Sequence, residues 1–136
     1  MPNRKIHKQR AALSTLPVHS ILINDKEDNF LPNILLELLS LATGMSIGST
    51  LADKFEPAYH PHHRSFLHSP IFGLIMGKAG YNAWQDIQQI RCMRKILNNE
   101  KVSLNELINI FLLGISVSYL DHLIADGFTP NGLPLY

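Results

Sequence analysis

The sequence lacks several features that define large classes of protein. It has a single cysteine, Cys92, in 136 residues, which excludes an internal disulfide and fits a reducing compartment. Its 12 Lys and Arg residues nearly balance 11 Asp and Glu residues, so the overall field that attracts bulk nucleic acid is missing. No apolar segment with a small-residue cleavage site follows the basic start of the chain, so we expect no signal peptide.

Strand-like patterns are also missing, because no run alternates polar and apolar residues for long enough to indicate a sheet. Apolar residues instead recur at three- and four-residue steps, which predicts an all-α fold, a small bundle of about four helices. Residues 1–30 look like a basic, loosely structured arm, and 31–136 like a single all-α metal-binding domain. The expected helices cover 33–51, 66–80, 82–97 and 103–127, the third capped by Asn82 and the fourth by Ser103.

Two segments, Ile34–Leu51 and Ile108–Ala125, approach the length needed to cross a membrane. The first contains Glu37 and the second Asp121 and His122. Because charged groups at bilayer depth are costly, the pattern favours buried core helices over membrane spans.

Five of the seven histidines fall into two clusters, four between His60 and His68 and one at His122. His122 and Asp126 are four apart on the expected last helix and continue its apolar face. A carboxylate on an inward face is costly unless it is paired or binds a metal, so this pair is a candidate for metal ligands. The alternative is that the two residues form the solvated last turn of the helix.

The middle cluster lies on an expected loop over 53–64, which carries two prolines. His63 on this loop and His68 in the first turn of the next helix can face one point. Asp53 and Glu56 supply carboxylates for a metal or a general base, and Arg64 offers a planar fork suited to phosphate. His60 and His62 are expected to be solvated neighbours. The alternative for the whole cluster is a surface loop of solvated histidines.

These residues resemble two signatures of one family. The segment from His63 to Ser69 is similar to the H-R-G-x-T-H-S motif of the YdjM-like, membrane-associated metal-dependent hydrolases, with Ser65 and Leu67 replacing glycine and threonine. The segment from Tyr119 to Leu135 is similar to that family's H-x-x-x-D motif followed by T-P-x-G-V-P-L. A third motif, P-D-x-D-H-P, is matched only at Asp53, because Phe55 stands at its second aspartate. The resemblance implies an all-α fold related to zinc-dependent phospholipases C.

The function that follows is hydrolysis of phosphoester or phosphodiester bonds with zinc or another divalent metal. The expected ligands are Asp53, His63, His68, His122 and Asp126. Glu56 is the candidate general base or additional ligand, and Arg64 is expected to stabilise charge on the phosphoryl group. Two alternatives are a non-catalytic protein that keeps a structural metal site, and a Ser69 nucleophile activated by His68.

The expected partners are a phosphate-containing small molecule or lipid, with a protein partner possible through the apolar helices. We expect a cytoplasmic protein that at most associates with the inner face of a membrane. Basic residues of the first segment, Arg4, Lys5, Lys8 and Arg10, could then touch anionic lipid, at roughly 1 kcal/mol per charge and in a salt-sensitive manner.

Overall fold

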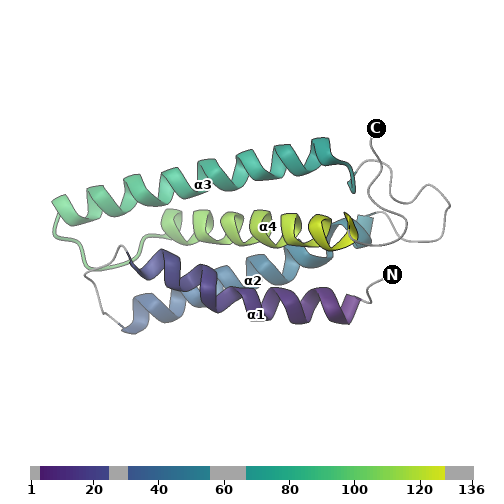
Figure 1. Ribbon diagram of the computed structural model, residues 1–136. Helices are drawn as coiled ribbons and strands as arrows, with labels where there is room; N and C mark the ends of the chain where they lie inside the picture. Colours follow the sequence, from purple (N-terminus) through teal and green to yellow (C-terminus); the bar gives the residue numbers. More distant parts are fainter. Residues whose placement is uncertain (1–3, 25–30, 56–66, 128–136) are drawn as a thin grey trace.

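The computed structural model describes residues 4–24, 31–55 and 67–127, and all of these ranges are dominated by helix. Four helices follow one another: α1 (Arg4–Asn24), α2 (Leu31–Phe55), α3 (Pro70–Ile96) and α4 (Leu104–Gly127). No strand occurs in the described part of the chain, so the all-α prediction is confirmed. Helix α4 lies between α3 on one side and α1 and α2 on the other (Figure 1).

The first helix corrects the expectation of a loosely structured arm. Residues 4–24 form α1, which packs against α2. Its buried face is formed by Ala11, Thr15, His19 and Leu22, which are spaced three or four residues apart. Two of these four are polar, so a search for apolar periodicity misses the face. Pro17 lies inside the helix and its side chain is exposed, at the cost of one backbone hydrogen bond.

The two helices expected over 66–80 and 82–97 are one continuous helix, α3. Gly80 and Asn82 therefore neither end nor cap a helix. A Cβ at Gly80 would lie 2.8 Å from the Cβ of Ser116, so this glycine permits close packing of α3 on α4. The helix begins at Pro70, the last position of the expected range 66–70, so His68 precedes its first turn; Ser69 caps it and accepts a hydrogen bond from the Phe72 N–H at 3.3 Å.

The start of α4 is confirmed as an N-cap at Ser103, whose Oγ accepts from the Glu106 N–H at 3.1 Å. Helices α2 and α4 approach so closely that a Cβ on Gly44 or Gly48 would meet the backbone of the other helix. At Gly48 the added atom would overlap the Ile115 carbonyl oxygen. The small residues four apart therefore serve contact between these two helices.

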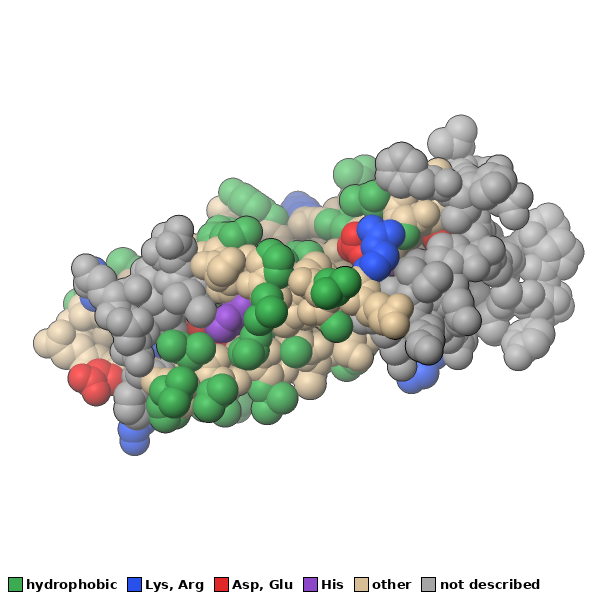
Figure 2. Space-filling view, turned by 60° about the horizontal axis from the view of Figure 1, so that its bottom comes forward, with side chains coloured by type: hydrophobic (Ala, Val, Ile, Leu, Met, Phe, Trp, Pro, Cys, Tyr) green, Lys and Arg blue, Asp and Glu red, His purple; other side chains and the backbone are tan. Residues whose placement is uncertain are grey.

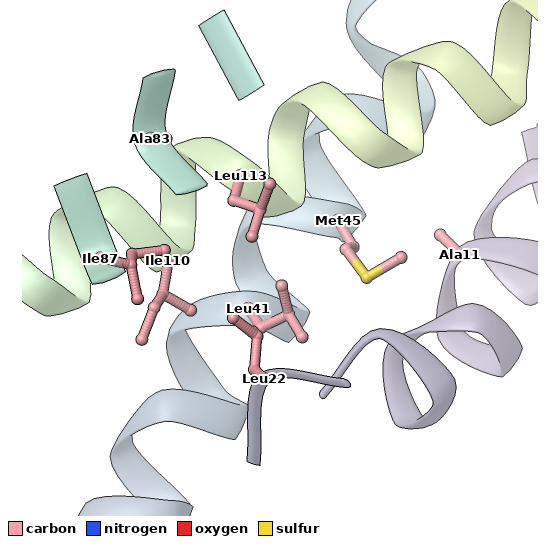
Figure 3. Close-up of a cluster of buried hydrophobic side chains, with 8 residues drawn as sticks. All are labelled: Ala11, Leu22, Leu41, Met45, Ala83, Ile87, Ile110 and Leu113. Atoms are coloured by element: carbon pink, nitrogen blue, oxygen red, sulfur yellow. The ribbon is translucent and has the colours of Figure 1, made fainter. Parts of the chain in front are cut away.

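All four helices contribute to the main apolar core (Figure 3). The core contains eight buried side chains, and each helix provides two of them: Ala11, Leu22, Leu41, Met45, Ala83, Ile87, Ile110 and Leu113. A smaller cluster of Ala52, Tyr119 and Leu123 lies near the ends of α2 and α4. The second cluster is next to the residues described below as a candidate site.

A buried ionic network joins the helices at the opposite end of the bundle. The Nε of Arg91 donates to Glu106 Oε1 at 2.8 Å, and its Nη2 donates to Glu37 Oε2 at 3.3 Å. The remaining nitrogen, Nη1, donates to the Leu22 carbonyl oxygen at 2.6 Å. Arg94 adds an ion pair with Glu106 at 3.4 Å. One guanidinium thus contacts groups from the other three helices.

Candidate metal centre

The site begins with two residues of the last turns of α4. His122 and Asp126 are separated by four residues, so their side chains leave the same face of the helix. The side chains are 1% and 4% exposed, and His122 Nε2 lies 3.3 Å from Asp126 Oδ2. The prediction that this pair points inward is confirmed, and the alternative of a solvated last turn is wrong.

His68 approaches the pair from the turn that precedes α3. Its Nε2 lies 3.4 Å from Asp126 Oδ2 and 3.4 Å from His122 Nε2, and its side chain is 1% exposed. The next residue, Ser69, uses its hydroxyl oxygen to cap α3, so its local role is to fix the turn that carries His68. This role gives no support to the idea that Ser69 is a nucleophile.

The fourth member is Asp53, in the last turn of α2. Its Oδ1 lies 3.7 Å from His68 Nε2 and 3.8 Å from His122 Nε2. Sequence patterns placed Asp53 on a loop, but α2 continues to Phe55, and a rigid helix therefore holds this carboxylate. Its side chain is 28% exposed, so Asp53 forms the solvent-facing edge of the cluster.

The spacing of these atoms fits one small divalent cation. The five measured separations among the four side chains lie between 3.3 and 3.8 Å. A tetrahedral zinc ion with bonds of about 2.0–2.1 Å holds its ligand atoms roughly 3.3–3.4 Å apart. Two imidazole nitrogens and two carboxylate oxygens are also ligand types that zinc accepts. Three of these ligand atoms, from Asp53, His68 and His122, all lie within 4.8 Å of one another.

The surroundings of the cluster are mostly apolar on the protein side. Phe72 and Tyr119 pack edge to face at a centroid distance of 5.4 Å; Tyr119 belongs to the smaller core cluster, and Phe72 packs against it. Leu123 also belongs to this cluster and Leu67 packs against it, and these two leucines are neighbours in sequence of two site histidines. Apolar packing on this side lowers the local dielectric and strengthens electrostatic interactions among the four side chains.

Two charged residues near the site pair with each other. Arg10 Nη2 donates to Asp121 Oδ1 at 2.8 Å, which joins α1 to α4 beside the cluster. From the sequence, Asp121 was considered only as an ionisable residue next to His122, and Arg10 was expected to contact anionic lipid. No pattern in the sequence indicates this pair, because 111 positions separate its members.

Four of the five expected ligands therefore come together, from three separate segments of the chain. The fifth, His63, lies outside the described residues, as do Glu56 and Arg64 and the loop histidines His60 and His62. Glu56 directly follows α2, and Arg64 precedes His68 by four residues.

The fold and the site define a helical bundle with a buried histidine and carboxylate cluster and with much apolar surface. Helices α2 and α4 are long and apolar enough to cross a membrane. The chain belongs to the YdjM inner membrane protein family, whose model matches residues 40–136 and so includes all four clustered side chains. Comparison with curated proteins and with solved structures found no match. Membership of this family supports association with a membrane.

Proposed function

We propose that the protein is a metal-dependent hydrolase of phosphoester or phosphodiester bonds, and that zinc is the metal. The observation that carries the proposal is that the Nε2 atoms of His68 and His122 lie 3.4 Å apart and each lies 3.3–3.8 Å from a carboxylate oxygen of Asp53 and of Asp126. A zinc ion held there would polarise a phosphoryl oxygen and lower the pKa of a water towards about 7.

The four side chains have different tasks in this proposal. His68, His122 and Asp126 are nearly inaccessible, so they hold the cation and fix its position. Asp53 is partly exposed, so substrate approaches from its side of the cluster. Glu56, three residues beyond Asp53, accepts a proton from the attacking water or serves as a further ligand. Arg64 donates to the phosphoryl oxygens as their charge increases.

The surface beside the site favours a substrate with an apolar part, such as a lipid phosphate ester. A groove of about 700 Å³ lies between α3 and α4. Its walls include Pro70, Leu74, Leu120 and Ile124, and also Gly127, which follows the ligand Asp126 in the sequence. A phosphate group at the cluster would leave an attached acyl chain free to enter this groove.

We also propose that the site lies on the cytoplasmic side of the membrane. The basic residues Arg4, Lys5, Lys8 and Arg10 fall in the first turns of α1, at the same end of the bundle as the cluster. Basic residues near membrane-embedded segments are concentrated on the cytoplasmic side. In a Cys92→Ser background, an impermeant maleimide should then label Lys54→Cys, an exposed position next to Asp53, in inverted membrane vesicles and leave it unlabelled in intact spheroplasts.

A second candidate is a non-catalytic protein in which the same residues hold a structural metal. It is favoured by the number of ligands, because four protein side chains can fill a tetrahedral shell and leave no position for substrate. The apolar helices would then bind a partner. Asp53 separates the two candidates, since it is the ligand at the exposed edge.

Metal analysis of protein purified without chelators tests both candidates. We expect close to one equivalent of zinc, and less than roughly a tenth of an equivalent would overturn the site itself. A panel of soluble and lipid phosphodiesters then tests turnover by the zinc-loaded protein. Asp53→Asn should abolish hydrolysis with little loss of thermal stability if the site is catalytic, and should lower stability without any measurable turnover to lose if it is structural.

The matched control is Asp86→Asn, which makes the same change at an exposed position of α3 outside the cluster. It should alter neither metal content nor turnover. Arg64→Ala gives a second test of catalysis, because zinc content should be retained while turnover falls by about 100-fold or more. Zinc-loaded protein that hydrolyses none of the phosphodiesters would favour the structural candidate.

A further inference from the structure

The exposed surface of the bundle differs between its two sides. Large apolar side chains on α1 and α2 point outward, and we call this surface the α1–α2 face; its members are Leu13, Leu16, Ile21, Leu35, Leu36, Leu39 and Ile47. Figure 2, which brings this side forward, shows hydrophobic side chains over the middle of the face and charged ones mainly towards its ends. Leu13 and Leu39 expose 77% and 64% of their surface, more than scattered surface leucines of a water-soluble bundle require.

Charged side chains are missing from most of the exposed length of the two helices that form this face. Between residues 11 and 23 of α1 there is no ionisable side chain except the buried His19. Between residues 31 and 52 of α2 the one charged residue is Glu37, which is fully buried and paired with Arg91. Along most of the α1–α2 face, therefore, no charged side chain would lose its hydration if the face entered a bilayer.

Two hydroxyl groups on the outer side of α1 and α2 also need no water. Ser20 Oγ donates to the Pro17 carbonyl oxygen at 2.7 Å, and Thr43 Oγ1 donates to the Leu39 carbonyl oxygen at 2.8 Å. Serine and threonine in membrane helices are satisfied in this way, by the backbone of the preceding turn. These side chains are thus compatible with hydrocarbon.

The outer surface of α3 exposes apolar side chains such as Leu74 and Ile96 towards its ends, but its middle is polar. Its middle exposes Lys78, Asn82, Gln85, Asp86 and Gln89. Asp86 is about 15 Å along the axis from one end of α3 and about 24 Å from the other, at 1.5 Å per residue. If the bundle stood across a hydrocarbon core of about 30 Å, these polar groups would face lipid near its centre. The middle of the outer surface of α3 therefore requires water.

We propose that the bundle lies along the plane of the membrane, with the α1–α2 face in the acyl chains of the bilayer and α3 facing water. The chain belongs to a family of inner membrane proteins, which favours a membrane as the occupant of the apolar face, and the distribution of charge indicates which face enters it. The two helices of spanning length have different roles: α4 is the central helix and packs against the others, and α2 contacts lipid along its side. Attachment by this face should resist high salt, unlike the contact through basic residues expected from the sequence.

Fluorescent labelling of single cysteines tests the proposal in the full chain. The native Cys92 is exposed on α3 and provides the aqueous reference. In a Cys92→Ser background, Leu16→Cys and Leu39→Cys place an environment-sensitive label on the α1–α2 face, and Gln89→Cys places it on α3. The labelled proteins are reconstituted in vesicles of phosphatidylethanolamine and phosphatidylglycerol, and circular dichroism checks that each remains helical.

We expect blue-shifted emission at positions 16 and 39, with severalfold stronger quenching by doxyl lipids than by iodide. Positions 89 and 92 should show the reverse. Labels at 16 and 39 that iodide quenches as strongly as the label at 89 would overturn the proposal. Labels shielded from both quenchers would overturn it as well, because a second copy of the chain or another protein would then cover the face.

Depth measurements separate a lying bundle from a spanning one. Leu35 and Ile47 are 12 residues apart on α2, or about 18 Å along its axis. With labels at Leu35→Cys, Leu39→Cys and Ile47→Cys, a lying bundle gives the same ratio of quenching by shallow and deep doxyl lipids at all three positions. A ratio that changes steadily along α2, or lipid quenching at position 89, means that the bundle spans the bilayer and that the proposed orientation is wrong.

Discussion

The Nε2 atoms of His68 and His122 lie 3.4 Å apart, although 54 positions separate the two residues in sequence. Their rings are tilted by 51°, so the nitrogens and not the ring faces approach each other. Two carboxylates lie close to the same pair of nitrogens. Asp53, His68 and His122 thus offer three ligand atoms within 4.8 Å of one another, and Asp126 lies beside both histidines.

Removal of metal should therefore lower the stability of the fold. A ligand that binds the folded state at 100 times its Kd stabilises that state by about 2.7 kcal/mol. We expect the melting temperature to fall when a chelator is added and to recover with zinc, as followed by circular dichroism. His122→Ala should melt at the lower temperature with or without zinc. A wild-type melting temperature that is insensitive to chelator would count against a bound metal.

Two aspartates of α4 should respond differently to the same change. Asp126→Asn should lower zinc affinity by about 10-fold or more, because its carboxylate lies 3.3–3.4 Å from both histidine nitrogens. Asp121→Asn removes an exposed ion pair with Arg10 and should cost no more than about 1 kcal/mol of stability, with zinc affinity unchanged. Isothermal titration with zinc and urea unfolding measure the two effects. Equal loss of zinc affinity in both variants would contradict the assignment of Asp126.

The buried ionic network predicts a large effect of removing one partner. Arg91→Met leaves Glu37 and Glu106, both fully buried, without the guanidinium that joins them, and should destabilise the fold by about 3–5 kcal/mol. Lys95→Met, the control, changes an exposed cation one turn away and should stay within about 0.5 kcal/mol. Urea unfolding of both variants measures the difference. If Arg91→Met were as mild as the control, the network would contribute little.

Two glycines provide a test of helix packing. Gly48→Ala places a Cβ against the Ile115 carbonyl oxygen, which would push α2 and α4 apart and cost about 1–3 kcal/mol. Gly77→Ala meets nothing nearer than 3.8 Å, so it should stabilise α3 by up to about 1 kcal/mol through helix propensity. Opposite shifts in melting temperature are expected. A stabilising Gly48→Ala would show that the two helices are farther apart than this contact requires.

The sequence predicted those parts of the structure that depend on local chemistry. The helix starts at Ser103 and near Pro70 were predicted because capping and proline preferences act within one turn. The four-residue spacing of His122 and Asp126 was enough to put them on one face. Asp53 and His68 were selected partly through family motifs, which carry information about distant contacts that spacing alone does not.

The errors arose where packing between helices decides the structure. Gly80 was interpreted as a helix end, but its small size is required by Ser116 of a neighbouring helix. The helical face of α1 was missed because Thr15 and His19 occupy buried positions that a pattern search reserves for apolar residues. Nor did any local signal indicate the contacts of Arg91, whose partners are between 15 and 69 positions away.

The central position of α4 has a consequence for synthesis of the protein. This helix follows the other three in the chain, and the backbone of α3 packs against it and not against α1 or α2. While the ribosome is still translating α4, the pair formed by α1 and α2 lacks the helix that joins it to α3. The apolar side chains that α4 will cover then need the bilayer or a chaperone until it has emerged. Capture of zinc by the cluster would accordingly be one of the last events of biogenesis, and a convenient reporter that assembly is complete.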